Sequence, residues 1–306
     1  MSLCGCVGRV MVAWWCRRLW LLLAAVSLAP CVGVSAADAG AATAPSASPP
    51  EYVFAVVADP HLNETLWSGL PSGLERWEQL IEAILRRPSR PEFLLVLGDI
   101  MPPLDPVTQQ PDLTALTRAA ARLPLYPVAG NRDSPAVRAA LRKAFPELFG
   151  ERDFYAFTRH RCRFVMVCNA AFGDHYGHLT AQSIRGQPQW PWLEAELRRA
   201  PEVDRVIVCG HVPPHPSGAD AVMYLALGDQ RLLADLVNRH APAALFFGHT
   251  HARQEFRLGP SKVYVAPSSH WNLQGQPPGY LEVRVAAAGL AVDLVTLEES
   301  SPAGKP

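Results

Sequence analysis

The sequence predicts an α/β fold in one domain of about 245 residues. From residue 51 onward, short apolar runs typical of buried strands alternate with segments whose apolar residues recur at helical spacing. Beyond residue 253 the pattern changes, because strands separated by turns continue without helices between them. Hydrophobic residues make up 49% of the 306 residues, which is enough for a sizeable core.

The first half of the domain predicts three strand and helix pairs. Helix starts are marked by Asp112, near the beginning of the second helix, and by Pro135, which opens the third. The expected strands cover 52–58, 93–97 and 125–129, and the helices 74–87, 112–123 and 135–145.

The second half predicts more strands than helices. Strands are expected at 163–168, 205–209 and 244–247, with helices at 190–200 and 229–240 between them. The remaining strands are expected at 255–258, 262–266, 280–287 and 290–297.

The segment before residue 51 has the features of an export signal. Two arginines, Arg17 and Arg18, precede the apolar run 19–29, and small residues follow, so we expect a signal peptide over 1–37 with cleavage after Ala36 or Ala37. The run is short for a membrane span, although an uncleaved anchor over 19–29 is the alternative. We therefore expect an exported protein, periplasmic or secreted, with no stable membrane span after processing.

The other boundaries follow from composition. An Ala/Pro/Ser-rich stretch over 38–50 predicts a flexible linker, the α/β domain is expected over 51–298, and 299–306 form a tail. Abundant arginine, alanine and proline are typical of a high-GC bacterial coding sequence. A formal net charge of zero argues against a nucleic-acid partner.

Polar side chains capable of binding metal follow five of the predicted strands. Four of the five groups come directly after a glycine, which allows a tight turn at the strand end. Ligands in α/β sheets bind at these carboxyl ends, so we expect the side chains to converge. The residues are Asp59 and His61, Asp99, Asn131, His211, and His249 and His251.

This mixed set of oxygen and nitrogen donors suits Mn, Fe, Zn or Co better than Ca or Mg. Seven donors are too many for one ion, and a central carboxylate can bridge two. Two metal ions about 3.5–4 Å apart are typical of sites for displacement at phosphorus. Taken singly, an Asp or His at a strand end is more often a turn or cap residue, so the prediction depends on the whole ordered set.

These motifs resemble the calcineurin-like metallophosphoesterase family over residues 52–297. The matching motifs are Asp59-Pro-His61, Gly98-Asp99, Gly130-Asn131-Arg132-Asp133, Gly210-His211 and Gly248-His249-Thr250-His251. The resemblance implies a two-sheet β-sandwich flanked by helices, in four α/β/β/α layers. It also implies two divalent or trivalent metal ions, with Mn, Fe or Zn expected.

The resemblance further assigns the ligands. One metal is expected at Asp59, His61 and His251, the other at Asn131, His211 and His249, with Asp99 bridging both. A metal-bridging hydroxide would then attack phosphorus in small phosphomonoesters or phosphodiesters, which are the expected partners.

One position departs from the family, because Arg132 stands where most members have histidine. Arginine cannot donate a proton at working pH, but it can grip a phosphate and stabilise developing charge. We therefore expect Arg132 and Asp133 to be catalytic residues, and Arg132 and His215 to bind substrate. The alternative function is a metal-containing homologue that binds a phosphate ligand with weak or lost turnover.

Two other pairs of residues have alternative interpretations. His175 and His178 could form a substrate rim or a solvated loop. His270 and Trp271 could form a stacking surface or pack in the core.

Overall fold

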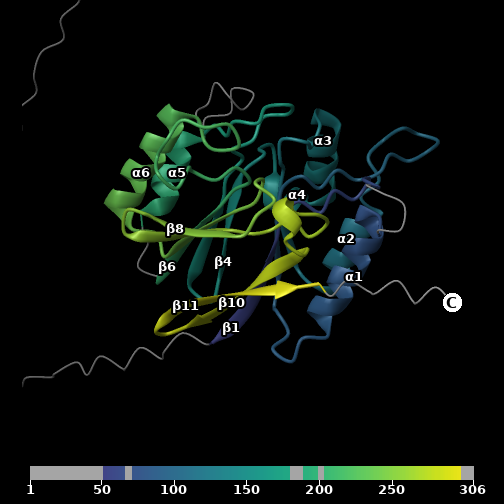
Figure 1. Ribbon diagram of the computed structural model, residues 1–306, viewed down its shortest axis with the longest axis horizontal. Helices are drawn as coiled ribbons and strands as arrows, with labels where there is room; N and C mark the ends of the chain where they lie inside the picture. The colour runs from purple at the N-terminus through teal and green to yellow at the C-terminus, as the bar shows by residue number, and fades with distance from the viewer. Residues whose placement is uncertain (1–50, 66–70, 180–188, 199–202, 298–306) are drawn as a thin grey trace, which may run out of the picture. The chain divides into compact units, whose positions relative to one another are not determined.

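The computed structural model describes residues 51–65, 71–179, 189–198 and 203–297, and the fold below concerns these residues (Figure 1). The predicted signal peptide, the linker and the tail fall outside them, so these boundaries stay predictions. Within the described ranges no helix is long and apolar enough to cross a membrane.

The first sheet joins both ends of the domain. Its strand order is β11-β10-β1-β2-β3. Strands β1, β2 and β3 run parallel, whereas β10 pairs antiparallel with β1 and forms a hairpin with β11. Their bounds are Tyr52–Val57 (β1), Leu94–Leu97 (β2), Leu125–Val128 (β3), Gly279–Ala286 (β10) and Gly289–Thr296 (β11).

The second sheet has the order β4-β5-β6-β7-β9-β8. Its four central strands are parallel, and antiparallel strands close both edges. The bounds are Tyr155–Arg159 (β4), Cys162–Met166 (β5), Arg205–Cys209 (β6), Ala244–Phe247 (β7), Gln254–Leu258 (β8) and Ser261–Val265 (β9).

Helices cover the outer faces of the two sheets. In Figure 1, α1 and α2 lie on one side of the sheets and α5 and α6 on the other. The prediction of an α/β fold with two sheets flanked by helices is therefore confirmed. The helices are Gly73–Leu85 (α1), Thr114–Arg122 (α2), Pro135–Ala144 (α3), Pro146–Phe149 (α4), Trp190–Leu197 (α5), Leu227–His240 (α6) and the short 3-10 helix Leu273–Gly275 (η1).

The period-two pattern of the strands explains the layers. In β5, Phe164 faces the core between the sheets, whereas its neighbour Val165 packs in the cluster that holds Leu193 of α5 and Leu233 of α6. Across the inter-sheet core, the ring of Phe54 from β1 meets Phe164 edge-on at 5.3 Å between centroids. The alternating faces thus bury both sides of the second sheet.

Local signals fix several of the helix starts. Ser72 caps α1 in a capping box with Glu75, and Ser134 caps α3 immediately before Pro135. The structure adds β4, which the sequence analysis did not predict. The β4–β5 turn uses His160 and Arg161 with positive φ of 47° and 61°, where Asn-Gly would have marked a hairpin.

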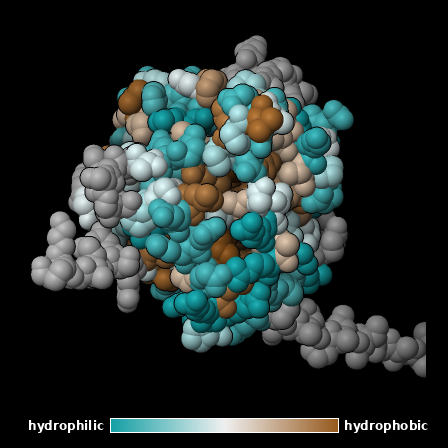
Figure 2. Space-filling model, turned by 90° about the vertical axis from the view of Figure 1, so that its right-hand side faces the viewer, coloured by the Kyte–Doolittle hydropathy of each residue, from teal (hydrophilic) through white to brown (hydrophobic). Residues whose placement is uncertain are grey.

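The outer helix layer carries a cleft of its own. Figure 2 shows the face of the molecule at the right of Figure 1, where hydrophobic atoms at the centre are surrounded by hydrophilic ones. A cleft of about 290 Å³ lies on α1 and α2, and charged residues such as Glu78 and Arg118 flank apolar ones such as Trp77 and Ile81. Its lining contains none of the predicted metal ligands.

Candidate metal centre

The loops after β1, β2, β3, β6 and β7 bring the predicted metal ligands together. Six of the seven form two buried groups, and the donor atoms within each group lie within 4.8 Å of one another. The first group is Asp59, His61 and His251, and the second is Asp99, His211 and His249. The grouping has the arrangement expected of a dinuclear metal site.

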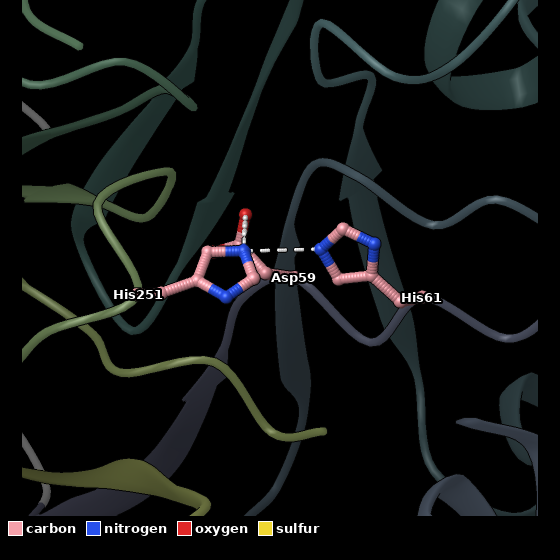
Figure 3. Close-up of side chains that lie close together, drawn as sticks. All are labelled: Asp59, His61 and His251. Atoms are coloured by element: carbon pink, nitrogen blue, oxygen red, sulfur yellow. Dashed lines mark hydrogen bonds and ion pairs between the residues drawn. The ribbon is translucent and has the colours of Figure 1, made fainter. Parts of the chain in front are cut away.

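The first group points its donors at a common centre. In Figure 3 the imidazoles of His61 and His251 face each other, and their Nε2 atoms are 3.1 Å apart. Asp59 Oδ1 lies 3.7 Å from His251 Nε2. This carboxylate oxygen is buried without a hydrogen-bond partner, a costly state that a bound cation would relieve.

The tautomers of these histidines favour a cation. His251 Nδ1 donates to the carbonyl oxygen of Trp271 at 2.9 Å, so its Nε2 carries a lone pair. His61 Nδ1 faces Glu64 Oε1 at 3.3 Å, which likewise leaves Nε2 as the lone-pair atom. Two lone pairs 3.1 Å apart repel each other unless a positive charge lies between them, and therefore a metal ion fits this group.

The second group is arranged in the same way, except that the two ring nitrogens of His249 exchange roles. His211 Nδ1 donates to the Leu97 carbonyl at 2.8 Å, and His249 Nε2 donates to the His175 carbonyl at 3.2 Å. The remaining atoms, His211 Nε2 and His249 Nδ1, face each other at 3.1 Å. Asn131 Oδ1 lies 3.1 Å from His211 Nε2, so the amide oxygen joins this donor set.

Asp99 lies between the two groups. Its Oδ1 is 3.4 Å from His211 Nε2, and its Oδ2 is 4.0 Å from His61 Nε2. One carboxylate oxygen is thus directed at each group, which is the geometry that a bridging ligand needs.

Burial sets the electrostatics of the centre. It raises the pKa of Asp59 and of Asp99, because the charged carboxylates lose water, and the nearby Asp99 carboxylate raises the pKa of Asp59 further. It lowers the pKa of His211 to about 4 and of both His249 and His251 to about 3. These three imidazoles are therefore neutral at physiological pH and do not neutralise the carboxylates, which favours metal cations at this site.

The backbone at these ligands is strained. Five of the seven adopt left-handed φ values: Asp59 (51°), His61 (44°), Asp99 (48°), His249 (70°) and His251 (48°). This conformation raises the free energy of non-glycine residues, and such residues cluster at functional sites. Gly98 supplies the close approach beside Asp99, because a Cβ there would lie 2.4 Å from His211 Nδ1.

Asp133 connects the loop after β2 with the loop after β3. It is fully buried, and its carboxylate accepts backbone N–H bonds from Gly130 (2.8 Å), Ile100 (3.2 Å) and Met101 (2.8 Å). These contacts hold the loop after β2 against the loop after β3. They give Asp133 a positioning role, whereas its predicted catalytic role has no contact with the pocket to support it and stays a prediction.

Of the two residues predicted to bind substrate, only Arg132 lines a cavity at the metal centre. Arg132 lines a cavity of about 210 Å³ over both ligand groups, together with His175, Met223, Trp271 and Leu273 on the rim. His215 is not among the lining residues. Its Nδ1 contacts Ser217 and its ring packs edge-on against Tyr224, so substrate binding by His215 stays a prediction without structural support.

In each of the two residue pairs with alternative interpretations, one residue lines the cavity and the other does not. His175 and Trp271 line the cavity. His178 instead contacts Asp174 at 3.0 Å, and the Nε2 atom of His270 faces the carbonyl of Pro71 at 3.4 Å.

Some residues of the site carried no usable sequence signal. Buried Asn169 accepts the backbone N–H of His211 at 2.9 Å and donates to the Val212 carbonyl at 2.6 Å, which orients the His211 loop. Glu64 contacts His61, Arg132 and Trp271. Only its position three residues after His61 could have drawn attention to it.

Comparison with known proteins agrees with this geometry. The sequence profile of the Calcineurin-like phosphoesterase family matches residues 52–253. A cAMP/cGMP dual specificity phosphodiesterase of Mycobacterium tuberculosis is 28% identical over 211 residues, which cover 66% of this chain and 62% of that protein. A protein of Rhodococcus erythropolis named "Probable cyclic nucleotide phosphodiesterase" is 25% identical over 72% of this chain and 71% of its own length.

Solved structures share the fold. A dimetal phosphatase from Danio rerio has a TM-score of 0.55 at 15% identity, covering 79% of this chain and 98% of its own. The protein described as "GAP50 the anchor in the inner membrane complex of Plasmodium" has a TM-score of 0.53 at 12% identity, covering 80% and 84%. At such identities the likeness shows the fold alone.

Proposed function

Because this chain belongs to the calcineurin-like phosphoesterase family and has two buried groups of metal donors, we propose that it hydrolyses small phosphodiesters. Cyclic nucleotides are the substrate class we put first. The single observation that carries the proposal is the pair of buried donor groups with Asp99 directed at both.

The choice of phosphodiesters rests on the relatives. Both similar curated proteins carry names of cyclic nucleotide phosphodiesterases. This chain spans 62% of the length of the Mycobacterium protein, so that protein's activity is transferred here as a proposal. The cavity of about 210 Å³ is lined by residues of both donor groups, where the phosphate of a diester would bind.

The residues divide the chemistry between them. When bound, two metal ions would polarise the phosphoryl oxygens and supply a nucleophile at neutral pH. Arg132 reaches the cavity from the loop after β3 and can hold a non-bridging phosphate oxygen through its guanidinium. Trp271 and Leu273 give the rim an apolar surface for the organic part of the substrate.

A turnover screen tests the proposal. Protein loaded with Mn²⁺ is assayed with cAMP and cGMP, with bis(p-nitrophenyl) phosphate and with p-nitrophenyl phosphate. We expect the diesters to be cleaved faster than the monoester, and Asp99→Asn to abolish both activities. Phosphate binding without any turnover would support the ligand-binding alternative, and cleavage of the monoester alone would overturn the diesterase assignment.

Two further parts of the proposal concern the metals and export. We propose Mn, Fe or Zn because the donors mix carboxylate, amide and imidazole groups, and elemental analysis of purified protein identifies them. We also propose that the protein is exported, because residues 1–37 have a signal-peptide pattern. Mass spectrometry of the exported form should give a mature start near Ala37 or Asp38, whereas an intact N-terminus would favour the anchored alternative.

A further inference from the structure

Glu64 lies at the mouth of the metal centre and has three side-chain partners from three segments. Its Oε1 is 3.3 Å from Arg132 Nη2 and 3.3 Å from His61 Nδ1, and its Oε2 accepts the Trp271 indole N–H at 3.1 Å. The backbone of Glu64 is held as well, because its carbonyl accepts the N–H of Gly73 at 2.8 Å, at the start of α1. Both the backbone and the side chain of Glu64 are therefore held in place.

Arg132 depends on this carboxylate for its orientation. Its side chain is 47% exposed, and Glu64 is its one side-chain partner among the residues that the structure describes. The backbone N–H of Arg132 donates to Asp99 Oδ1 at 2.8 Å, which fixes where the side chain leaves the loop. A long side chain fixed only at its base would sample many rotamers, so the Glu64 contact restricts the guanidinium before substrate binds.

The contact leaves Arg132 free to act. Glu64 engages one guanidinium nitrogen, so the donors on the other nitrogens remain available for a phosphate oxygen. A bidentate contact with the carboxylate would instead occupy the pair of guanidinium N–H donors that binds phosphate.

The second partner, Trp271, also lines the cavity. The Trp271 ring packs on His251 at 4.0 Å between centroids and 6.0 Å from His61, and its N–H is tied to Glu64. One carboxylate therefore fixes both the charged wall and the aromatic wall of the cavity.

We propose that Glu64 is a positioning residue that holds Arg132 and Trp271 in their substrate-binding orientations without touching the substrate itself. The proposal rests on the proposed function of the cavity as a phosphoryl site. It differs from a role for Glu64 in stability or in metal retention.

The test compares Glu64→Ala, Glu64→Gln and Arg132→Ala in metal-loaded protein. We expect Glu64→Ala to weaken binding of inorganic phosphate, measured by calorimetry, and to lower kcat/KM for bis(p-nitrophenyl) phosphate, each about tenfold to hundredfold. Glu64→Gln keeps an amide oxygen for one partner and should recover part of the loss. In the Arg132→Ala background, Glu64→Ala should cost less than about threefold, because its main partner is gone.

Control variants distinguish this positioning role from a role of Glu64 in stability or in metal retention. Glu78→Ala removes the acidic partner of an exposed ion pair with Arg118 on α1 and α2, and it should leave phosphate binding unchanged. If Glu64→Ala instead empties the metal sites, its role is toward His61 and the proposal is overturned. Additive losses in the double variant would also overturn it. Phosphate binding reports on Glu64 even if the wild type cleaves no diester, so failure of the proposed function is recognised separately.

Discussion

At the scale of single residues, Arg132 is the cavity residue on which the proposed chemistry depends most. The guanidinium is half-exposed at the cavity and cannot serve as a proton donor. We expect Arg132→Ala to lower turnover by about 10²–10³ while metal content stays unchanged, because a charge-stabilising donor is lost. Steady-state kinetics and elemental analysis of the same sample measure both quantities.

Two further variants refine that prediction. Arg132→Lys should recover only part of the activity, since it keeps the charge and loses the planar fork. Arg132→His restores the commoner residue and should gain most on alkyl phosphate esters, whose leaving groups need a proton. Wild-type rates for Arg132→Ala on alkyl and aryl esters alike would show that the guanidinium does not hold phosphate.

The buried carboxylates predict how metal binding depends on pH. The pKa values of Asp59 and Asp99 are raised by burial, so the metal-free site holds its protons to a higher pH than free carboxylates do, and a metal ion competes with those protons. The folded-state pKa values of His211 (about 4) and His251 (about 3) are lower. Above about pH 5, protons therefore do not compete with the metal ion for these imidazole nitrogens. Apparent Mn²⁺ affinity should therefore rise with pH by about tenfold per unit for each proton released, and level off above the carboxylate pKa values.

Calorimetry in buffers of different ionisation enthalpy counts those protons. An affinity that falls as pH rises from 6 to 8 would contradict the assignment.

The sequence predicts the metal donors well and their supporting residues poorly. Asp59, Asp99 and His249 stand at the carboxyl ends of apolar strands, where ligands of α/β sheets converge. Glu64 and Asn169 act through contacts with residues far away in the sequence, and a single chain carries no local pattern for such contacts. His215 shows the converse, because proximity to His211 in sequence does not bring its ring into the cavity.

At the scale of elements, the turns after the strands decide whether the centre can form. Gly98 ends the β2 segment with φ of +84°, and an added Cβ would meet His211 Nδ1 at 2.4 Å. We expect Gly98→Ala to lower both metal content and stability, with about 1–2 kcal/mol from the left-handed backbone alone. Elemental analysis and thermal unfolding measure the two effects.

A matched glycine serves as the control. Gly228 lies in α6 with nothing within 4 Å of an added Cβ, so Gly228→Ala should leave metal content unchanged and be neutral or mildly stabilising. Equal behaviour of the two variants would show that close packing at Gly98 is not required.

Elements with strong periodicity were predicted, and the failure to predict strand β4 has a physical cause. Helix α1 has both a capping box and an apolar stripe, so its existence could be read from the sequence. Strand β4 lies at a sheet edge, with burial falling off toward Arg159, so its apolar signal is weak. The turn that follows it lacks glycine and asparagine, and therefore gave no hairpin signal either.

At the scale of the whole molecule, the centre depends on two sheets held in fixed register. The Phe54 ring of β1 is fully buried, stacks on Phe93 at 5.1 Å and meets Phe246 of the second sheet at 6.0 Å. We expect Phe54→Ala to destabilise the protein by about 3–5 kcal/mol, because it opens a cavity between the sheets. Denaturant unfolding measures this loss, and a change below about 1 kcal/mol would contradict the packing described here.

The same packing links the sheets to the metal centre. Asp59 and Asp99 follow strands of the first sheet, whereas His211 and His251 follow strands of the second. Each donor group therefore draws on both sheets, and metal binding should raise the unfolding temperature of the whole domain.

The metal content of two single variants tests the central claim most directly. Elemental analysis of the wild type should give about two ions per chain. Asp99→Asn should lower occupancy of both positions, because its carboxylate is directed at both groups, whereas His251→Ala should empty mainly one. An Asp99→Asn protein that retains the wild-type metal content would contradict the bridged two-metal centre.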